Sequence, residues 1–70
     1  MLTRVNLLAA DLREADLTFA MLNQAKLTRA NLGRALLNGS ALIAAILTEA
    51  DLSGANLHHA SLFQAQLGGA

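Results

Sequence analysis

Residues 50–60 decide the fold, because they carry two copies of one five-residue pattern: Ala50-Asp51-Leu52-Ser53-Gly54-Ala55-Asn56-Leu57-His58-His59-Ala60. Each copy is an alanine, then an aspartate or asparagine, then a leucine and two variable residues. Leucine recurs every five residues at all fourteen positions from Leu2 to Leu67. Alanine stands two places before each of these leucines from residue 5 onward, except at Val5 and Ser40. A repeat this regular determines the architecture ahead of any local propensity.

The five-residue period fits neither a straight helix nor a straight strand. Five residues of α-helix turn through about 500°, so successive leucines would spiral around every side. On a strand they would alternate between the two faces, because five is odd. A chain that turns a corner once per pentapeptide keeps every leucine, and the alanine two places before it, on the inside. The pattern therefore predicts a solenoid whose coils pair as in a parallel sheet, with strands of only two or three residues.

Glycine marks several of the expected corners. Gly39, Gly54 and Gly69 each stand two places after a leucine, where a type II turn requires a positive φ. The charges leave the number of pentapeptides per coil open. With twenty residues per coil Glu14 lies beside Arg34, and with fifteen it lies beside another arginine. Alanine and leucine are also strong helix formers, so a helical fold remains the alternative.

Composition narrows the functional classes. The 70 residues include five basic and five acidic side chains, a formal net charge of zero, and no cysteine. Surfaces that bind nucleic acid or anionic membranes usually carry a basic excess, which is missing here. The longest apolar run, residues 41–47, is far shorter than a membrane span, and the start of the chain does not read as a secretion signal. We therefore expect a cytoplasmic location.

The best copies of the motif resemble the pentapeptide-repeat family. They are Ala10-Asp11-Leu12-Arg13-Glu14, Ala15-Asp16-Leu17-Thr18-Phe19, Ala30-Asn31-Leu32-Gly33-Arg34, Ala50-Asp51-Leu52-Ser53-Gly54 and Ala55-Asn56-Leu57-His58-His59. The resemblance covers nearly the whole chain. It implies an all-β fold, a right-handed quadrilateral parallel β-helix with four pentapeptides per coil, and hence about 3.5 coils over one domain, residues 1–70.

The resemblance says less about function than about fold. Some family members imitate duplex DNA and bind DNA gyrase, but they are acidic, much longer and often carry phenylalanine at the central position. Many others, abundant in cyanobacteria, have no assigned activity.

The polar residues of the motif do not form a reactive group. Asp11 and Asp51 would stand on a convex face, where we expect them to bond backbone groups or water instead of acting as an acid–base pair. His58 and His59 are adjacent, but two ligands alone make a weak metal site. The sequence therefore predicts no catalytic, cofactor-binding or metal-binding residues and no small-molecule substrate.

A group of apolar residues at outward positions departs most from the pattern. We call it the apolar belt: Met21, Leu36, Ala41, Ile43, Ile46 and Phe63. Single exposed apolar side chains carry no meaning, but a contiguous group indicates a binding surface. The belt is therefore the candidate interaction surface.

The repeat fills residues 2–70 and leaves no room in this chain for a capping segment, so the end coils are expected to expose leucines and unpaired backbone groups. We predict a non-enzymatic structural or protein-interaction module that self-associates through its open ends or through the belt. The expected partner is a protein or a second copy, with no nucleic acid and no membrane. The alternative is a DNA-mimic inhibitor of a DNA-binding enzyme such as gyrase, which the neutral charge and short length disfavour.

Overall fold

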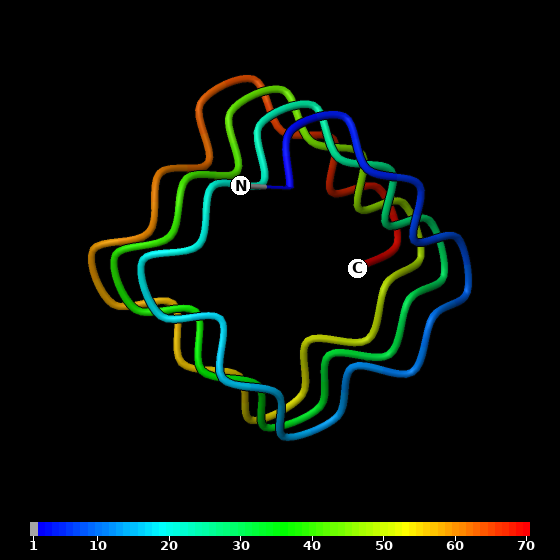
Figure 1. Ribbon diagram of the computed structural model, residues 1–70. Coiled ribbons are helices and arrows are strands. Elements are labelled where there is room, and N and C mark those ends of the chain that lie inside the picture. Colours follow the sequence, from blue (N-terminus) through cyan, green and yellow to red (C-terminus); the bar gives the residue numbers. More distant parts are fainter. Residues whose placement is uncertain (1) are drawn as a thin grey trace.

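The computed structural model describes residues 2–70, so Met1, the first residue of the predicted domain, lies outside the described part. Parallel β-bridges join residues twenty positions apart, from Asn6 with Lys26 to Ile46 with Gln66. The chain therefore returns to the same side after twenty residues and winds into stacked coils with a roughly square outline (Figure 1).

Residues 2–70 contain no helix and no strand longer than one bridging residue. The expectation of strands two or three residues long is therefore wrong in length. In each pentapeptide from Asn6 onward the residue before the leucine makes the bridge, and the two residues after the leucine already belong to a turn. The backbone leaves the extended conformation too soon for a longer strand to form.

A type II turn follows every leucine. The carbonyl of Leu12 accepts a hydrogen bond from the N–H of Ala15 at 3.1 Å, and Glu14 between them has φ of 61°. The residue two places after leucine has positive φ in all fourteen pentapeptides, as the glycines there predict. Eleven of these residues are not glycine, so the chain accepts a conformation that L-residues normally avoid.

Three hydrogen bonds per pentapeptide connect neighbouring coils and hold the turns in place. The N–H of Leu12 binds the carbonyl of Asn31 at 2.7 Å, and the N–H of Glu14 binds that of Gly33 at 2.8 Å. In the opposite direction the N–H of Asn31 binds the carbonyl of Ala10 at 2.8 Å. The donor at Glu14 is the residue with positive φ, so the inter-coil bond compensates for the strain of its turn.

The core lies in residues 22–50, which we call the middle segment because each of them has a coil on both sides. Its leucines at the repeat positions, Leu22 to Leu47, are 0–1 % exposed, and its inward alanines are 0–3 % exposed. In the N-terminal edge (residues 2–21) and the C-terminal edge (residues 51–70), the equivalent leucines are only half-buried or exposed. The inward direction of the leucines is thus confirmed, and complete burial requires a neighbouring coil above and below.

Candidate functional site

The aspartates and asparagines before leucine bind the backbone of their own turn. In six pentapeptides the side-chain Oδ1 accepts a hydrogen bond from the N–H two residues later, as Asp51 does from Ser53 at 2.9 Å and Asn56 from His58 at 3.0 Å. We call this bond the turn cap. It satisfies an outward N–H that no coil reaches. The prediction that these residues bond backbone groups is confirmed for these six turns.

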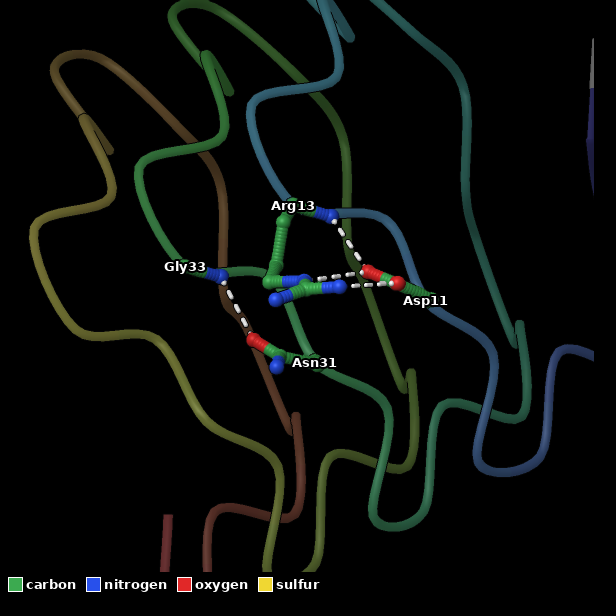
Figure 2. Close-up of polar contacts among 4 residues, drawn as sticks. All are labelled: Asp11, Arg13, Asn31 and Gly33. Atoms are coloured by element: carbon green, nitrogen blue, oxygen red, sulfur yellow. Dashed lines mark hydrogen bonds and ion pairs between the residues drawn. The ribbon is translucent and has the colours of Figure 1, made fainter.

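A shallow groove runs along the side that carries Asp11, Asn31 and Asp51. Its volume is about 720 Å³, and its lining is polar. Arg13 folds over Gly33 and places its guanidinium against Asp11, with Nε–Oδ1 at 2.8 Å and Nη2–Oδ2 at 2.7 Å (Figure 2). The gap left by the missing side chain of Gly33 is thus occupied by a neighbour that is already paired.

A second ion pair lies in the groove, and the other aspartate there, Asp51, accepts a backbone hydrogen bond instead. Glu14 lies 3.8 Å from Arg34 of the next coil, which is the pairing that a twenty-residue coil predicts. Acidic and basic side chains therefore alternate along this side, and the described residues of the groove form no continuous acidic stripe.

The three aspartates have lowered pKa values. The hydrogen bond from the Arg13 side chain lowers the pKa of Asp11 to about 2, and the Arg13 backbone N–H adds to this effect. Hydrogen bonds from Thr18 and from Ser53, side chain first and backbone second, lower the pKa of Asp16 and of Asp51. These groups stay ionised at neutral pH, whereas a general acid or base needs a pKa close to the working pH. The arrangement suits turn capping and not proton transfer.

The two histidines pair with each other. Their rings meet edge to face with centroids 4.0 Å apart. Among residues 2–70, no group of three or more His, Cys, Asp or Glu side chains is placed to hold a metal ion.

The predicted apolar belt lies on the outside of the prism and is centred on one side. Met21 bridges to Ala41, and Ile43 and Phe63 occupy equivalent positions in neighbouring coils, two residues further on. Met21, Ile43 and Phe63 are exposed, and Phe63 is the most open of them at 68 %. The two other members of the belt stand on the adjoining sides: Leu36, exposed, and Ile46, half-buried.

Several turns of the described chain lack a cap, and the belt accounts for four of them; the turns that follow Lys26, Ser61 and Gln66 lack one as well. Four of its members, namely Met21, Leu36, Ala41 and Ile46, stand at the position that elsewhere carries the capping aspartate or asparagine. Only one of the affected turns finds a substitute, since the N–H of Ile43 binds Oδ1 of Asn23 from the preceding coil at 3.2 Å. In the described chain no side chain caps the corresponding N–H of Asn38 or Thr48. Apolar residues of the belt thus stand where an aspartate or asparagine would cap the turn.

Two structural details next to the belt were not predicted from the sequence. Phe19 is 76 % exposed, and its ring lies against Gly39 of the next coil, where an added Cβ would come within 2.5 Å of Cε1. Ser40 replaces an inward alanine, and its Oγ is buried without a hydrogen-bond partner. The twenty-residue register places Phe19 beside Gly39, so this contact is readable from the sequence once the coil length is known.

The C-terminal edge carries a second hollow, of about 710 Å³. Its apolar lining includes the four leucines of that edge, Leu52, Leu57, Leu62 and Leu67. The hollow lies at the end of the stack, where these leucines lack a further coil in the described chain.

Comparison with known proteins identifies a protein family and solved structures that resemble this chain. The family described as "Pentapeptide repeats" matches in eight copies, over residues 1–29, 25–62 and 35–70. A solved structure of alr5209, a pentapeptide repeat protein from Nostoc Pcc 7120, is 33% identical, with a TM-score of 0.35. The match covers 91% of this chain and 65% of that one, so this chain spans just under two thirds of the neighbour. No curated protein matches significantly. In residues 2–70 no helix has the length and apolar character needed to cross a membrane.

Proposed function

Because this chain belongs to the pentapeptide-repeat family, we propose that it is a non-enzymatic structural module that binds other protein surfaces, including a second copy of itself. Membership in the family implies a right-handed β-helix. We propose that this helix is quadrilateral in cross-section, with four pentapeptides per coil and about 3.5 coils. The bridges between residues twenty positions apart support this geometry. Two surfaces serve binding: the apolar belt on the side, and the edges of the first and last coils.

The observation that carries the proposal is the exchange of turn caps for exposed apolar side chains. A turn cap satisfies a backbone N–H. Selection for stability alone would therefore keep the aspartate or asparagine that provides it. At Met21, Leu36 and Ala41 the chain presents an apolar group outward instead. These positions are neighbours in the structure, and an apolar patch of this kind is typical of a protein contact.

The polar groups support a binding role over a catalytic one. Asp11 is held by Arg13, and Asp16 and Asp51 are held by their own turns, so each carboxylate already has a structural partner. The groove beside them is shallow, and four of its charged side chains form two ion pairs, Arg13 with Asp11 and Arg34 with Glu14.

Sedimentation velocity over a range of protein concentrations tests the proposal. The chain is expected to sediment faster as its concentration rises, beyond the value for a 7.3 kDa monomer. Ile43→Glu combined with Phe63→Glu places charges in the belt and is expected to weaken this association. The matched control is Thr28→Glu combined with Thr48→Glu, the same turn position on the neighbouring side, which is expected to leave it unchanged.

A folded chain that remains a monomer up to millimolar concentration would contradict self-association. Equal effects of the belt pair and the control pair would remove the belt from the proposal.

A further inference from the structure

The two ends of the coil stack differ in hydrogen-bonding character. Toward the next coil, each pentapeptide donates two N–H groups, as Leu12 and Glu14 do, and offers one carbonyl, as Ala10 does. Toward the previous coil the ratio is reversed, with two carbonyls and one N–H. The stack is therefore polar along its axis: rich in donors at the C-terminal edge and rich in acceptors at the N-terminal edge.

The free backbone groups at the two edges follow this polarity. At the C-terminal edge, eight N–H groups of the kind that elsewhere bond the next coil have no backbone acceptor: those of Leu52, Gly54, Leu57, His59, Leu62, Gln64, Leu67 and Gly69. At the N-terminal edge, seven described carbonyls of the kind that elsewhere accept from the previous coil receive no backbone donor: those of Thr3, Asn6, Leu8, Asp11, Arg13, Asp16 and Thr18. The two sets occupy equivalent positions in the pentapeptide, so seven of the eight donors have a described counterpart that the regular twenty-residue register would place opposite them.

Apolar surface accompanies these donors and acceptors. The hollow of the C-terminal edge, about 710 Å³, is lined by four leucines, and Leu67 is 41 % exposed. At the other end Leu2 is 38 % exposed. In the middle segment the same positions are covered by the leucines of the next coil, so leucines are the natural occupants of the hollow.

We infer that the C-terminal edge binds the N-terminal edge of a second copy, head to tail, so that the coils of two molecules continue as one stack. This inference rests on the proposed binding function and specifies the partner and its orientation. Head-to-tail contact repeats the three hydrogen bonds that each pentapeptide makes inside the molecule. Contact between two C-terminal edges would face donors with donors and leave one of every two N–H groups without an acceptor.

The orientation has a consequence for assembly. A head-to-tail contact uses two different surfaces of each molecule and leaves one of each free at the ends of the stack, so the assembly does not close after two copies. The stacks are expected to lengthen with concentration, whereas a contact between like edges would stop at a dimer.

Disulfide trapping tests the orientation, because the natural chain has no cysteine. Gly68→Cys marks the C-terminal edge, and nothing lies within 4 Å of a Cβ added there. The partner variants are Thr3→Cys, Leu8→Cys, Arg13→Cys and Thr18→Cys, which place a thiol at the same turn position on each side of the N-terminal edge. Stacked coils lie about 4.8 Å apart, close enough for a disulfide between equivalent positions.

Oxidation of equimolar mixtures is expected to give a mixed disulfide dimer in at least one of the four combinations and none in the Gly68→Cys protein alone. A Gly68→Cys homodimer would overturn the inference in favour of contact between like edges. Failure of all four mixtures to cross-link would overturn it as well.

Sedimentation of an edge variant separates this inference from the proposed function. Leu67→Arg places a charge in the hollow at an exposed position, so the fold is expected to persist, as its far-UV spectrum will report. Leu67→Arg is expected to end the head-to-tail lengthening and to leave only the association through the belt, whereas Ile43→Glu with Phe63→Glu weakens the association through the belt and leaves the head-to-tail lengthening intact. If the belt variant abolishes association and Leu67→Arg does not, the head-to-tail inference fails while the proposed binding function stands.

Discussion

Leu32 and Leu52 occupy the same column of the prism and the same place in the pentapeptide, yet only Leu32 is fully buried, at 1 % exposure. The difference is positional, since Leu32 has a coil above and below and Leu52 has one on a single side. The middle segment therefore behaves as a conventional core, and the two edges behave as half of an interface. The same sequence motif forms the core and the edges, and the number of neighbouring coils decides whether its leucine is buried.

The largest loss of stability is expected from a charge placed in the middle segment. Leu32→Lys removes a buried leucine, a loss of about 2–5 kcal/mol, and places a charge where no partner is available. This approaches the whole stability of a small domain, about 5–15 kcal/mol, so we expect an unfolded chain by circular dichroism. Leu52→Lys is the matched control, and we expect it to fold because its ammonium reaches water at the edge. If the two variants unfold alike, the distinction between middle and edge is wrong.

The second effect compares two glycine corners. Gly39→Ala and Gly54→Ala each put a Cβ at positive φ, 66° and 68°, at a cost of about 1–2 kcal/mol. The new Cβ at residue 39 also meets the ring of Phe19 at 2.5 Å, whereas at residue 54 the nearest atom is Arg34 Cγ at 3.4 Å. Urea unfolding is expected to show the larger loss for Gly39→Ala.

A double-mutant cycle isolates the ring contact at that corner. In a Phe19→Ala background, Gly39→Ala is expected to cost no more than Gly54→Ala. If Gly39→Ala still lowers the free energy of unfolding more than Gly54→Ala in the Phe19→Ala background, the extra cost arises from the backbone of the middle segment.

The third effect sharpens the description of the core. Ser40 is the polar exception among the inward alanines, and its buried Oγ has no hydrogen-bond partner. Ser40→Ala removes an unsatisfied group without changing the packing, so we expect a gain of about 1 kcal/mol in the free energy of unfolding. Ser61→Ala, at an exposed position of the C-terminal edge, is the control and is expected to change stability by less than about 0.5 kcal/mol. A loss on Ser40→Ala would mean that the hydroxyl has a partner.

The sequence predicts the repeat geometry because every pentapeptide has the same inward and outward positions. The inward leucines and alanines, the corner at Gly39 and the pairing of Glu14 with Arg34 follow from the five-residue period and the coil length. The coil length itself is not determined by the charges, since a neighbouring arginine is available in either register. The family resemblance supplies it.

Other features depend on the folded backbone and were not predictable in the same way. Positive φ at Phe19 or His59 contradicts the preference of these residues, and the inter-coil hydrogen bonds of the whole stack override it. The turn caps give the aspartate position its purpose, which the sequence indicated only in general terms. The apolar belt was predictable as a list of residues, but the missing caps at some of its positions, as at Leu36, and the substitute cap in the turn of Ala41 appear only once the bonds are known.

The smallest effect distinguishes the edges from the middle segment by pH. Every aspartate of the chain lies in an edge, whereas the middle segment has Asn31 and Leu36 in the same columns. The folded pKa of each aspartate is lowered, to about 2 for Asp11. A lowered pKa contributes stability above the unfolded value of about 3.9, and this contribution is lost as the pH falls through the folded pKa.

We therefore expect acid to weaken the edges first, between about pH 4 and pH 2. In an amide NMR titration the N–H signals of Thr18 and Ser53 should shift with the carboxyl groups that cap them. The N–H of Gly33, capped by the amide of Asn31 at 3.0 Å, should not follow a carboxyl titration. Asp51→Asn keeps a capping oxygen and removes the charge, so it should abolish the shift at Ser53 alone. A titration at Gly33 equal to that at Ser53 would show that acid loosens the whole stack, and the separation of edge and middle would then have no basis in the caps.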